Sequence, residues 1–538
     1  IDIVVPKGMY YAPRSIILDH PEAQLVLEPG VAIMFAKDTG IQMRQGSLQV
    51  LGTAGEPVEL VSTDQKVAEY GDDSITSSNE WGGVWFRSGA QASTLLDGEY
   101  ANGSRMRHCC LINAGAWASG IYLDSVTILM ENVKLQGRWT NGIYAFSPTH
   151  DVVLRDVSIF GFGYGFRLSG AGACISTSGL NISDSTIGVY LSPHANATIT
   201  NSTFAQISNY HIFSSQGRGS LDVTDSEFVD GRDGIYVTRQ TSPGLEVKID
   251  SLKMSGTSRP LRIDASSHLN IQRSSFESCS NIQIYTYGNV TFEANAVKNC
   301  VAGFSNPIIR LFGLESVSVE ANTFSNNEVL GSTRASAILY LGGGGSSPED
   351  FLVTNNNFSN PNTTYQISTG GFFGAAGRTV NAPLNLFDLG INPTTTSIDS
   401  RIFDDDEDPT KPTVEFEPFL PLDFTPSCPD DCSGQGTCFF PSICVCDTGW
   451  EGLTCATPTC SGVDGCSGQG RCVSIDSCEC NQGWLGTNCA IADCSLRNEC
   501  NGNGICSEPN VCTCAIEKGY TGEECSQCTS DARLINSD

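Results

Sequence analysis

Residues 120–191 read GIYLDSVTILMENVKLQGRWTNGIYAFSPTHDVVLRDVSIFGFGYGFRLSGAGACISTSGLNISDSTIGVYL, and the repeat within this stretch decides the fold. Its apolar triplets recur every 22 to 24 residues and continue beyond it: Gly120-Ile121-Tyr122, Gly142-Ile143-Tyr144, Gly165-Phe166-Arg167, Gly188-Val189-Tyr190, Tyr210-His211-Ile212 and Gly234-Ile235-Tyr236. A second series keeps the same spacing: Phe204, Phe228, Leu252, Phe276, Val297 and Phe324. Third runs such as Val152-Val153-Leu154 lie between them. Each period therefore has room for three short strands separated by Gly, Asn, Asp and Ser, and none for a helix.

The constant period predicts that each window stacks on the previous one as a rung of a right-handed parallel β-helix. Alternate residues would point inward, where Ile, Val, Leu and Phe form continuous stacks, while the outward residues stay polar. Strands about 4.8 Å apart would let about 15 rungs form a rod on the order of 70 Å long. We therefore predict an all-β fold with a right-handed parallel β-helix over residues 1–375.

A column of polar residues accompanies the second series, two positions before the apolar marker of its rung. Its members are Ser202, Ser226, Ser274, Asn295, Asn322 and Asn356. Asn and Ser tolerate turn conformations and would hydrogen-bond from one rung to the next. We interpret the column as turn chemistry, with sugar binding as the alternative.

Both ends of the predicted β-helix have informative sequences. The strings LVLEPGVAIMFA (25–36), GSLQVLGTAGEPVELVST (46–63) and WGGVWF (81–86) resemble the N-terminal rungs of many secreted right-handed β-helix proteins, with residues 64–80 as an inserted loop. Residues 376–424 would form a closing cap over the exposed edge of the last rung, although their composition also suits a disordered linker. The cap pattern of related β-helices is clearer at residues 414–420 than at residues 387–390.

Cysteine content changes abruptly at residue 428, because 19 of the 24 cysteines lie between Cys428 and Cys528. One six-cysteine frame occurs three times, at 428–455, 460–489 and 494–525, and its copies contain CSGQGTC, CSGQGRC and CNGNGIC. Units of about 30 residues bury too little apolar surface to fold alone, so disulfides must restrict their unfolded chain. The spacings do not fit structural zinc sites. Because disulfides persist in oxidising compartments, the frame predicts an extracellular protein.

The frame resembles EGF-like modules of the short kind found in tenascin-type arrays, with residues 526–538 as the start of a further module or a tail. The resemblance implies these pairs: Cys428-Cys438, Cys432-Cys444, Cys446-Cys455, Cys460-Cys472, Cys466-Cys478, Cys480-Cys489, Cys494-Cys506, Cys500-Cys512 and Cys514-Cys525. Calcium-binding members carry acidic or amide residues before the first cysteine, whereas ATPT precedes Cys460 and AIAD precedes Cys494 here, so we expect no calcium. The resemblance also implies O-glycosylation by fucose at Thr437.

The other five cysteines lie within the predicted β-helix. Cys279 and Cys300 lie 21 residues apart, about one rung, and are expected to bridge neighbouring rungs. Cys109, Cys110 and Cys174 have no predicted partner, and burial as small apolar groups is the alternative. An unpaired Cys528 suggests that the native polypeptide continues beyond this sequence, and the missing signal peptide suggests a processed product.

Composition restricts the partners. With 59 acidic and 30 basic residues the net charge is −29, so nucleic acid is a poor candidate ligand. No apolar run approaches the ~18 residues of a membrane span, so we expect no membrane insertion by this segment. N-glycosylation acceptors predict covalent glycans at Asn102, Asn181, Asn196, Asn201, Asn289, Asn357 and Asn362.

An enzyme is the main alternative, because right-handed β-helices include pectate lyases and polygalacturonases. The six histidines have no Gly-His-Gly context: His20, His108, His150, His194, His211 and His268. The closest candidates for acid–base or calcium chemistry are Asp222, Asp225, Asp250 and Asp264 with Arg262 and Arg273. We interpret these residues as solvated charges, and the acidic run 404–408 as a solvated cap loop rather than a calcium site. We predict no catalytic residue, metal or cofactor.

These features favour a mechanical or adhesive function. Our leading hypothesis is an extracellular structural glycoprotein, a subunit of a surface filament or coat, with EGF modules as linkers or docking arms. The pairing of an extended body with EGF repeats resembles proteins of algal flagellar hairs (mastigonemes). Expected partners are further copies of the chain or other extracellular proteins. The alternatives are a cell-surface adhesion or receptor ectodomain and a β-helix polysaccharide lyase or hydrolase.

Overall fold

The computed structural model divides into two compact units, Ile1–Phe424 and Thr425–Asp538. It describes residues 2–63, 80–96, 99–138, 141–170, 172–215, 219–238, 245–264, 268–286, 288–303, 306–313, 315–331, 333, 336–343, 347–370, 372, 376–389, 392–422, 428–439, 443–447, 449–452, 454–514 and 520–528. The predicted loop at 64–80 lies outside these residues except for Glu80, and so do residues 529–538 of the predicted C-terminal segment.

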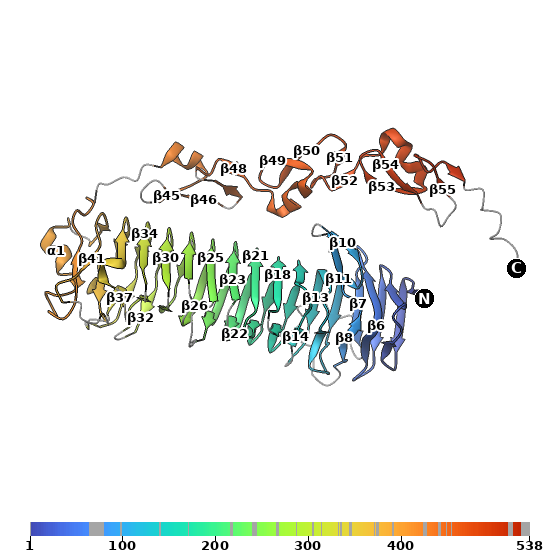
Figure 1. The fold of residues 1–538 in the computed structure, drawn as a ribbon, viewed down its shortest axis with the longest axis horizontal. Coiled ribbons are helices and arrows are strands. Elements are labelled where there is room, and N and C mark those ends of the chain that lie inside the picture. Colours follow the sequence, from blue (N-terminus) through green and yellow to red (C-terminus); the bar gives the residue numbers. More distant parts are fainter. Residues whose placement is uncertain are drawn as a thin grey trace. The chain divides into compact units, whose positions relative to one another are not determined.

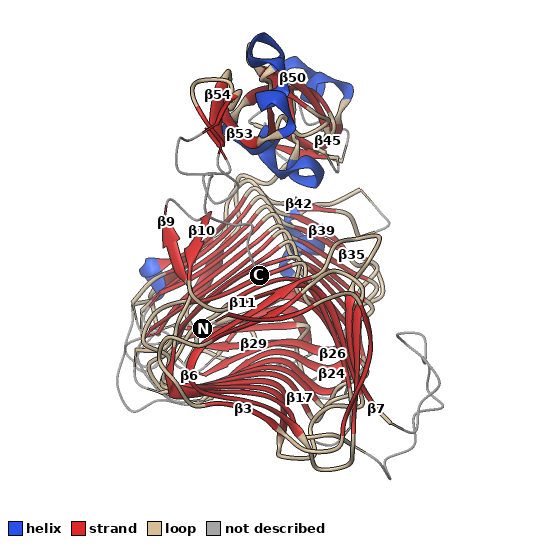
Figure 2. Cartoon of the chain, turned by 90° about the vertical axis from the view of Figure 1, so that its right-hand side faces the viewer, coloured by secondary structure: helices blue, strands red, loops and turns tan. Residues whose placement is uncertain are grey.

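The first unit is a β-helix whose strands form three parallel ladders, named faces A, B and C here (Figure 1). Figure 2 looks along the β-helix and shows the three faces around the core. Face A consists of β3 (Ile16–Leu18), β6 (Gly40–Leu51), β8 (Gly83–Ala90), β12 (Ser119–Asp124), β14 (Asn141–Phe146), β17 (Tyr164–Ser169), β20 (Ile187–Leu191), β22 (Thr203–Ser214), β24 (Glu227–Val237), β26 (Lys253–Asp264), β29 (Ile282–Tyr285), β33 (Ile309–Phe312), β37 (Ala337–Gly342), β40 (Tyr365–Thr369) and β43 (Ile402–Phe403).

Faces B and C use the other strands and parts of the long ones. Face B consists of β1 (Asp2–Val5), β4 (Gln24–Leu27), part of β6, β11 (Arg105–Ile112), β13 (Leu129–Gln136), β15 (Val152–Arg155), β18 (Cys174–Ser178), β21 (Asn196–Thr200), β23 (Gly219–Thr224), β25 (Leu245–Asp250), β27 (His268–Gln272), β30 (Asn289–Glu293), β34 (Val317–Glu320), β38 (Phe351–Thr354), β41 (Thr379–Asn381) and β44 (Thr413–Glu415). Face C consists of β2 (Gly8–Ala12), β5 (Val31–Phe35), β7 (Val58–Ser62), β16 (Ser158–Phe160), β19 (Asn181–Ser183), β28 (Ser275–Glu277), β31 (Ala296–Lys298), β35 (Thr323–Ser325), β39 (Asn357–Ser359), β42 (Leu386–Phe387) and parts of β11, β13, β22, β24 and β26.

The predicted all-β class and stacked repeat are confirmed, with fourteen steps between the fifteen strands of face A. Short additions lie outside the three ladders: the antiparallel pair β9 (Thr94–Leu96) and β10 (Glu99–Asn102), the parallel pair β32 (Val301–Ala302) and β36 (Glu328–Val329), the 3-10 turn η2 (Pro348–Asp350) and helix α1 (Thr395–Asp399). No helix in the described ranges is long and apolar enough to span a membrane.

Inward side chains form one continuous core from the first rungs to the cap. All six apolar markers of the second series are buried. Their rings contact one another between rungs, with 4.7 Å between the ring centroids of Phe204 and Phe228 and 4.9 Å between those of Phe324 and Phe358. The alternation of inward and outward residues that the sequence predicts is therefore the basis of the core.

Buried polar side chains close the ladder at the turn between faces B and C. The Oδ1 atom of Asn322 accepts the backbone N–H of Asn295 at 2.8 Å, and the Oδ1 of Asn356 accepts the N–H of Asn322 at 2.9 Å. The column extends beyond the predicted members to Asn385, whose Oδ1 atom accepts the N–H of Asn356. Turn chemistry, the interpretation that we favoured over sugar binding, accounts for these side chains, which are almost inaccessible to solvent.

A second polar column lies at the next turn along each rung. The Oδ1 atom of Asn327 accepts the N–H of Cys300 at 3.0 Å, and that of Asn360 accepts the N–H of Asn327 at 2.9 Å. Cys279 and Cys300 form a disulfide at the preceding positions of the same column. A covalent bond thus replaces the amide hydrogen bond between one pair of rungs.

The cap segment 376–424 contributes the last rung through β41 to β44. Within its acidic run, the buried Asp404 accepts the backbone N–H of Val414 at 2.7 Å, and Asp408 accepts from Thr410 and pairs with Lys411. The carboxylates at these two positions therefore hold the cap loop in its conformation. Burial raises the pKa of Asp404 to about 6.

The second unit contains three modules, each with a short 3-10 segment and two small hairpins. The 3-10 segments are η3 (Pro429–Gly434), η4 (Ser461–Gly468) and η5 (Ser495–Gly502). The paired strands are β45 (Gly436–Phe439) with β46 (Ile443–Cys446), β47 (Trp450–Glu451) with β48 (Thr457–Pro458), β49 (Gly470–Ser474) with β50 (Ser477–Cys480), β51 (Trp484–Leu485) with β52 (Ile491–Ala492), β53 (Gly504–Glu508) with β54 (Val511–Cys514), and β55 (Tyr520–Thr521) with β56 (Gln527–Cys528). Half-cystines form the core of each module.

Replacing Asn322 by alanine should destabilise the β-helix by about 3 kcal/mol, because the N–H of Asn295 and the carbonyl of Phe292 lose their partner inside the core. Denaturant unfolding of the first unit measures the change. Ser318→Ala is the matched control, since Ser318 points outward from face B. Equal stabilities of the two variants would contradict a structural role for the ladder.

Asp404→Asn should remove a pH dependence of cap stability. Burial raises the pKa of Asp404 to about 6 in the folded chain, from an ordinary value of 3.8. Between about pH 4 and pH 6 the folded chain therefore keeps a proton that the unfolded chain has already lost. The free energy of unfolding falls as the pH rises through this window. The difference in melting temperature between the variant and the native chain should therefore grow from pH 4 to pH 7, and the variant should melt higher at pH 7. A constant difference across this range would contradict the assignment.

Candidate binding surface

The six candidate acid–base residues from the sequence do not form one cluster. Asp250 pairs with Arg273 where strands of face B end. Asp264 and Arg262 form a separate pair on face A, with 3.6 Å between Arg262 Nε and Asp264 Oδ2. Asp222 lies on β23 of face B, and Asp225 lies at the turn that follows this strand. The sequence did not separate these residues, because their positions along the chain do not by themselves tell which face each side chain occupies.

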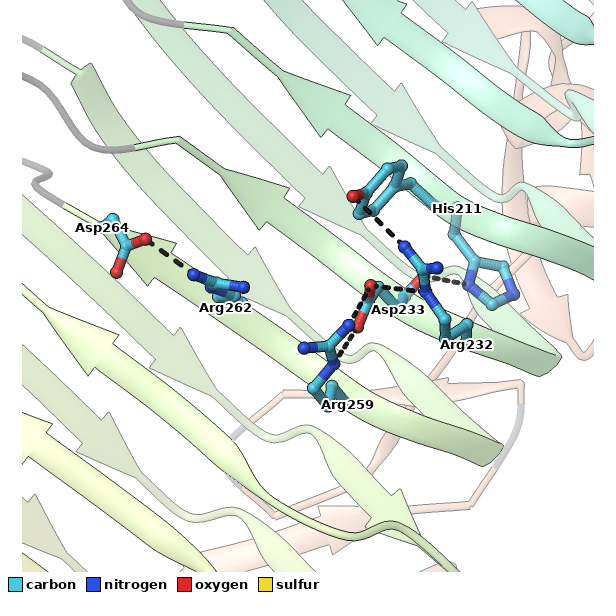
Figure 3. A network of polar contacts seen from close by, with 7 residues as sticks. His211, Arg232, Asp233, Arg259, Arg262 and Asp264 are labelled. Atoms are coloured by element: carbon cyan, nitrogen blue, oxygen red, sulfur yellow. Dashed lines mark hydrogen bonds and ion pairs between the residues drawn. The ribbon is translucent and has the colours of Figure 1, made fainter.

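A polar network on face A brings together a different set of charges (Figure 3). The carboxylate of Asp233, whose side chain is only 2% exposed, lies between two guanidinium groups, with Arg259 Nη2 2.8 Å and Arg232 Nε 3.2 Å from its Oδ2 atom. Arg232 also donates to the hydroxyl of Tyr210 at 3.3 Å. The buried carboxylate thus compensates the charges of two arginines that reach the surface of face A.

His211 lies beneath this network and belongs to the core. Its Nδ1 atom is 3.0 Å from the carbonyl oxygen of Asp233, and its ring stacks on Phe228 with 5.1 Å between centroids. Burial lowers the pKa of His211, which favours the neutral imidazole. In the register of face A this histidine takes the position that Gly188 and Gly234 hold in the adjacent rungs.

The outward side chains of face A form a continuous column, named the aromatic–arginine stripe here. In register from β8 to β37 its members are Trp85, Tyr122, Tyr144, Arg167, Tyr190, Phe213, Tyr236, Arg262, Gln283, Arg310 and Tyr340. The ring centroids of Trp85 and Tyr122 are 4.9 Å apart, and those of Tyr190 and Phe213 are 5.4 Å apart. All of these side chains are partly exposed.

Arginines lie over the rings of the stripe. The guanidinium carbon of Arg167 is 4.8 Å from the ring centroid of Tyr144 and 5.4 Å from that of Tyr190. Arg262 lies over Tyr236 at 4.7 Å, and Arg310 over Tyr340 at 5.0 Å. Each contact is within the range of a favourable cation–π interaction.

The signal for this surface was present in the sequence. The third residue of five of the six triplets that mark the repeat is Tyr122, Tyr144, Arg167, Tyr190 or Tyr236. The triplets mark the rung period, and their third residues also mark the outward column of face A. Stacking identical positions in register turns a repeated residue into a continuous chemical feature.

The cysteines of the second unit pair first to third, second to fourth and fifth to sixth in every module. Among the described residues, groups of three or more closely spaced metal-ligand side chains occur only as cysteine triplets, and all of these cysteines form disulfides. Cys109 is buried in the core of the first unit, and burial raises the pKa of its thiol. Cys110 and Cys174 are partly exposed, and neither forms a disulfide with another described cysteine.

The predicted glycosylation acceptors are distributed over particular faces. Asn102 lies on β10, whereas the others lie on faces B and C or at turns beside face C: Asn181, Asn196, Asn201, Asn289, Asn357 and Asn362. Five are exposed, and two, Asn196 and Asn357, are partly buried. Thr437 lies on β45 of the first module, and Cys528 lies on β56 at the end of the described residues.

Gly231→Ala should destabilise the β-helix by about 2 kcal/mol, because a Cβ atom there would lie 2.4 Å from Cε1 of His211. Denaturant unfolding measures the effect. Gly303→Ala is the control, since a Cβ atom at that glycine meets no atom within 4 Å. Adding His211→Ala should reduce the penalty of Gly231→Ala, and strictly additive effects would contradict the contact.

Comparisons with known proteins agree with this architecture. Residues 119–255 and 164–358 match the right-handed β-helix region, residues 428–455 match an EGF-like domain, and residues 463–492 match a teneurin-like EGF domain. No curated protein matches the sequence.

Solved structures that resemble the chain do so distantly. A lacto-N-biosidase from Eubacterium ramulus is 9% identical with a TM-score of 0.25, and the match covers 65% of this chain and 62% of that enzyme. An alginate lyase from Paenibacillus is 11% identical over 66% of this chain and 93% of its own, with a TM-score of 0.17. PfbA, a surface adhesin of Streptococcus pneumoniae, is 10% identical over 69% of this chain and 83% of its own, with a TM-score of 0.17.

The chain is a right-handed parallel β-helix followed by disulfide-rich modules of the EGF-like and teneurin-like EGF types.

Proposed function

We propose that the chain is an extracellular structural glycoprotein whose function depends on length and stiffness. It would serve as a subunit of a surface filament or coat such as a mastigoneme, with the EGF-like modules as linkers or docking arms. The observation that carries the proposal is the unbroken ladder of fourteen parallel steps on face A, filled by one continuous core. Bending such a body would break hydrogen bonds and core contacts together, so it resists deformation.

The junctions between modules support the same role. The backbone N–H of Asp476 donates to the carbonyl of Thr459 at 3.1 Å, and 34 residues later the N–H of Asn510 donates to the carbonyl of Asp493 at 2.9 Å. A Cβ atom at Gly449 would meet Ile475 at 2.7 Å, and one at the equivalent glycine of the next module would meet Pro509 at 2.6 Å. The two junctions use the same contacts, which makes the array more rigid than a chain of freely hinged modules.

Nine disulfides in three small modules are typical of an extracellular protein. Seven acceptor sequences would add glycans to the β-helix. We propose that the partners are further copies of this chain or other extracellular proteins.

Electron microscopy of the purified, glycosylated chain tests the proposal. At high concentration we expect a repeating fibre or side-by-side arrays, and uniformly dispersed monomers would contradict it. A sample with reduced disulfides is the comparison: arrays that persist after reduction pack through the β-helix, whereas arrays that disappear depend on the EGF-like modules.

A second candidate function is adhesion, as the ectodomain of a cell-surface protein. The aromatic–arginine stripe favours it, because an ordered row of aromatic and cationic groups is suited to recognition. For the lyase or hydrolase alternative, we propose that the chain has no such activity. Release of unsaturated or reducing ends from an acidic polysaccharide, lost in Asp225→Ala or Asp250→Ala, would overturn this proposal.

A further inference from the structure

We infer that the aromatic–arginine stripe on face A binds a linear anionic polysaccharide, which lies along the axis of the β-helix. The inference goes beyond the proposed structural role and does not depend on filament assembly. It rests on the geometry of the stripe, on its charge, and on the distribution of glycan acceptors over the other faces.

The stripe has the dimensions of a site for a polymer. From β8 to β37 its residues follow one another over ten rung steps, or about 50 Å at the spacing of parallel strands. One step is close to the length of one sugar unit in an extended chain, so a polysaccharide would meet an equivalent position at each successive unit. A small ligand would use only a fraction of this surface.

The stripe presents polar groups as well as ring edges. Tyr122, Tyr144, Tyr190 and Tyr236 are partly exposed, and their hydroxyls bond to no protein group within the described ranges. Phe146, which lies beside Tyr144 with 6.3 Å between ring centroids, is 42% exposed. Sugars combine hydroxyl groups with apolar C–H faces, and a row of tyrosines offers partners for both.

The charge of the surface is opposite to that of the chain. The face-A segments of strands β8 to β37 carry five arginines and three aspartates, whereas the whole chain has a net charge of −29. The arginines are Arg87, Arg167, Arg259, Arg262 and Arg310, and the aspartates are Asp124, Asp233 and Asp264. A local excess of guanidinium groups favours carboxylates or sulfates on the ligand.

Arg167 gives the inference its most direct support. Its guanidinium carbon lies within 5.5 Å of the ring centroids of Tyr144, Tyr164 and Tyr190. Its Nε atom is buried with no hydrogen-bond partner, and no described carboxylate pairs with it. Arg310 also lacks an ion pair among the described residues and bonds only the hydroxyl of Tyr285, at 3.4 Å. Rings fix both cations in place, while their charges remain available to an anion.

The glycan acceptors support the choice of face. None of the seven acceptor asparagines lies in a face-A segment, although these segments make up one of three faces. Glycans at the acceptors would cover faces B and C and leave the stripe accessible. A polymer lying on face A would therefore not compete with the chain's own glycans.

Rungs with aromatic residues separate the arginines of the stripe. This spacing favours an acidic polysaccharide over a densely charged polymer as the ligand. Between Arg167 on β17 and Arg262 on β26, the stripe contains Tyr190, Phe213 and Tyr236. This alternation fits a chain in which charged groups are attached to sugar rings. Inorganic polyphosphate has negative charge but no sugar rings, so its binding measures recognition by charge alone.

Biolayer interferometry of the full chain with immobilised polygalacturonate, hyaluronan and chondroitin sulfate tests the inference, with dextran as a neutral polysaccharide and polyphosphate as a charged polymer without sugar. We expect binding to at least one of the acidic polysaccharides, none to dextran, and weaker binding to polyphosphate. Absence of binding to all three, or equal binding to polyphosphate, would overturn the inference.

Variants locate the site. Arg167→Ala combined with Arg310→Ala should weaken binding at least tenfold, and Arg167→Lys should weaken it less because the charge remains. Arg14→Ala is the matched control, since Arg14 is exposed at the turn between β2 and β3, outside the stripe, and it should leave affinity within twofold. If the double variant does not fold, Arg310→Gln alone tests a separate rung. Equal losses in Arg14→Ala and the stripe variants would show that only net charge matters and would refute the inference.

Discussion

The first unit depends on one constraint: each rung must match the hydrogen-bonding groups of the rungs on both sides. Strands meet this constraint along the faces, but backbone N–H groups at the turns lie inside the protein and need side-chain partners. Asn295, Asn322, Asn356 and Asn385 supply them at one turn, and Asn327 and Asn360 at the next. Between residues 274 and 385 the ladder of amides helps keep the rungs in register, and the register of the stacked strands makes both the core and the outer surfaces continuous.

Register links the fold to the candidate function. Because Tyr122, Tyr144, Arg167 and Tyr190 occupy equivalent positions in successive rungs, they become neighbours in space although 22 or 23 residues separate them. The same rule explains His211, which fits into the position that Gly188 and Gly234 hold in the adjacent rungs, because Gly231 leaves room for its ring. A substitution in one rung therefore changes the contacts of the adjacent rungs, both in the core and along the stripe.

The fold was predictable because hydrophobic spacing and cysteine spacing are local properties of the sequence. The period of the triplets identified the rungs, and the six-cysteine frame identified the modules. The candidate surface was not predictable to the same extent, because the sequence does not tell which face an outward residue occupies. Asp250 and Asp264 were grouped together on that account, and the structure places them on faces B and A. The second asparagine column was missed because cysteines occupy its earlier positions, Cys279 and Cys300, so that only Asn327 and Asn360 mark it in the sequence.

The disulfide between Cys279 and Cys300 has a mechanical consequence. A β-helix under tension can unwind from either end, one coil at a time, because each coil is held by its neighbour. The covalent bond joins two adjacent coils within the column of amides, so the 21-residue segment between them cannot be drawn out by pulling. Under tension the bond carries the force past this closed segment, so pulling through this part of the first unit releases 21 fewer residues of chain than it would without the crosslink.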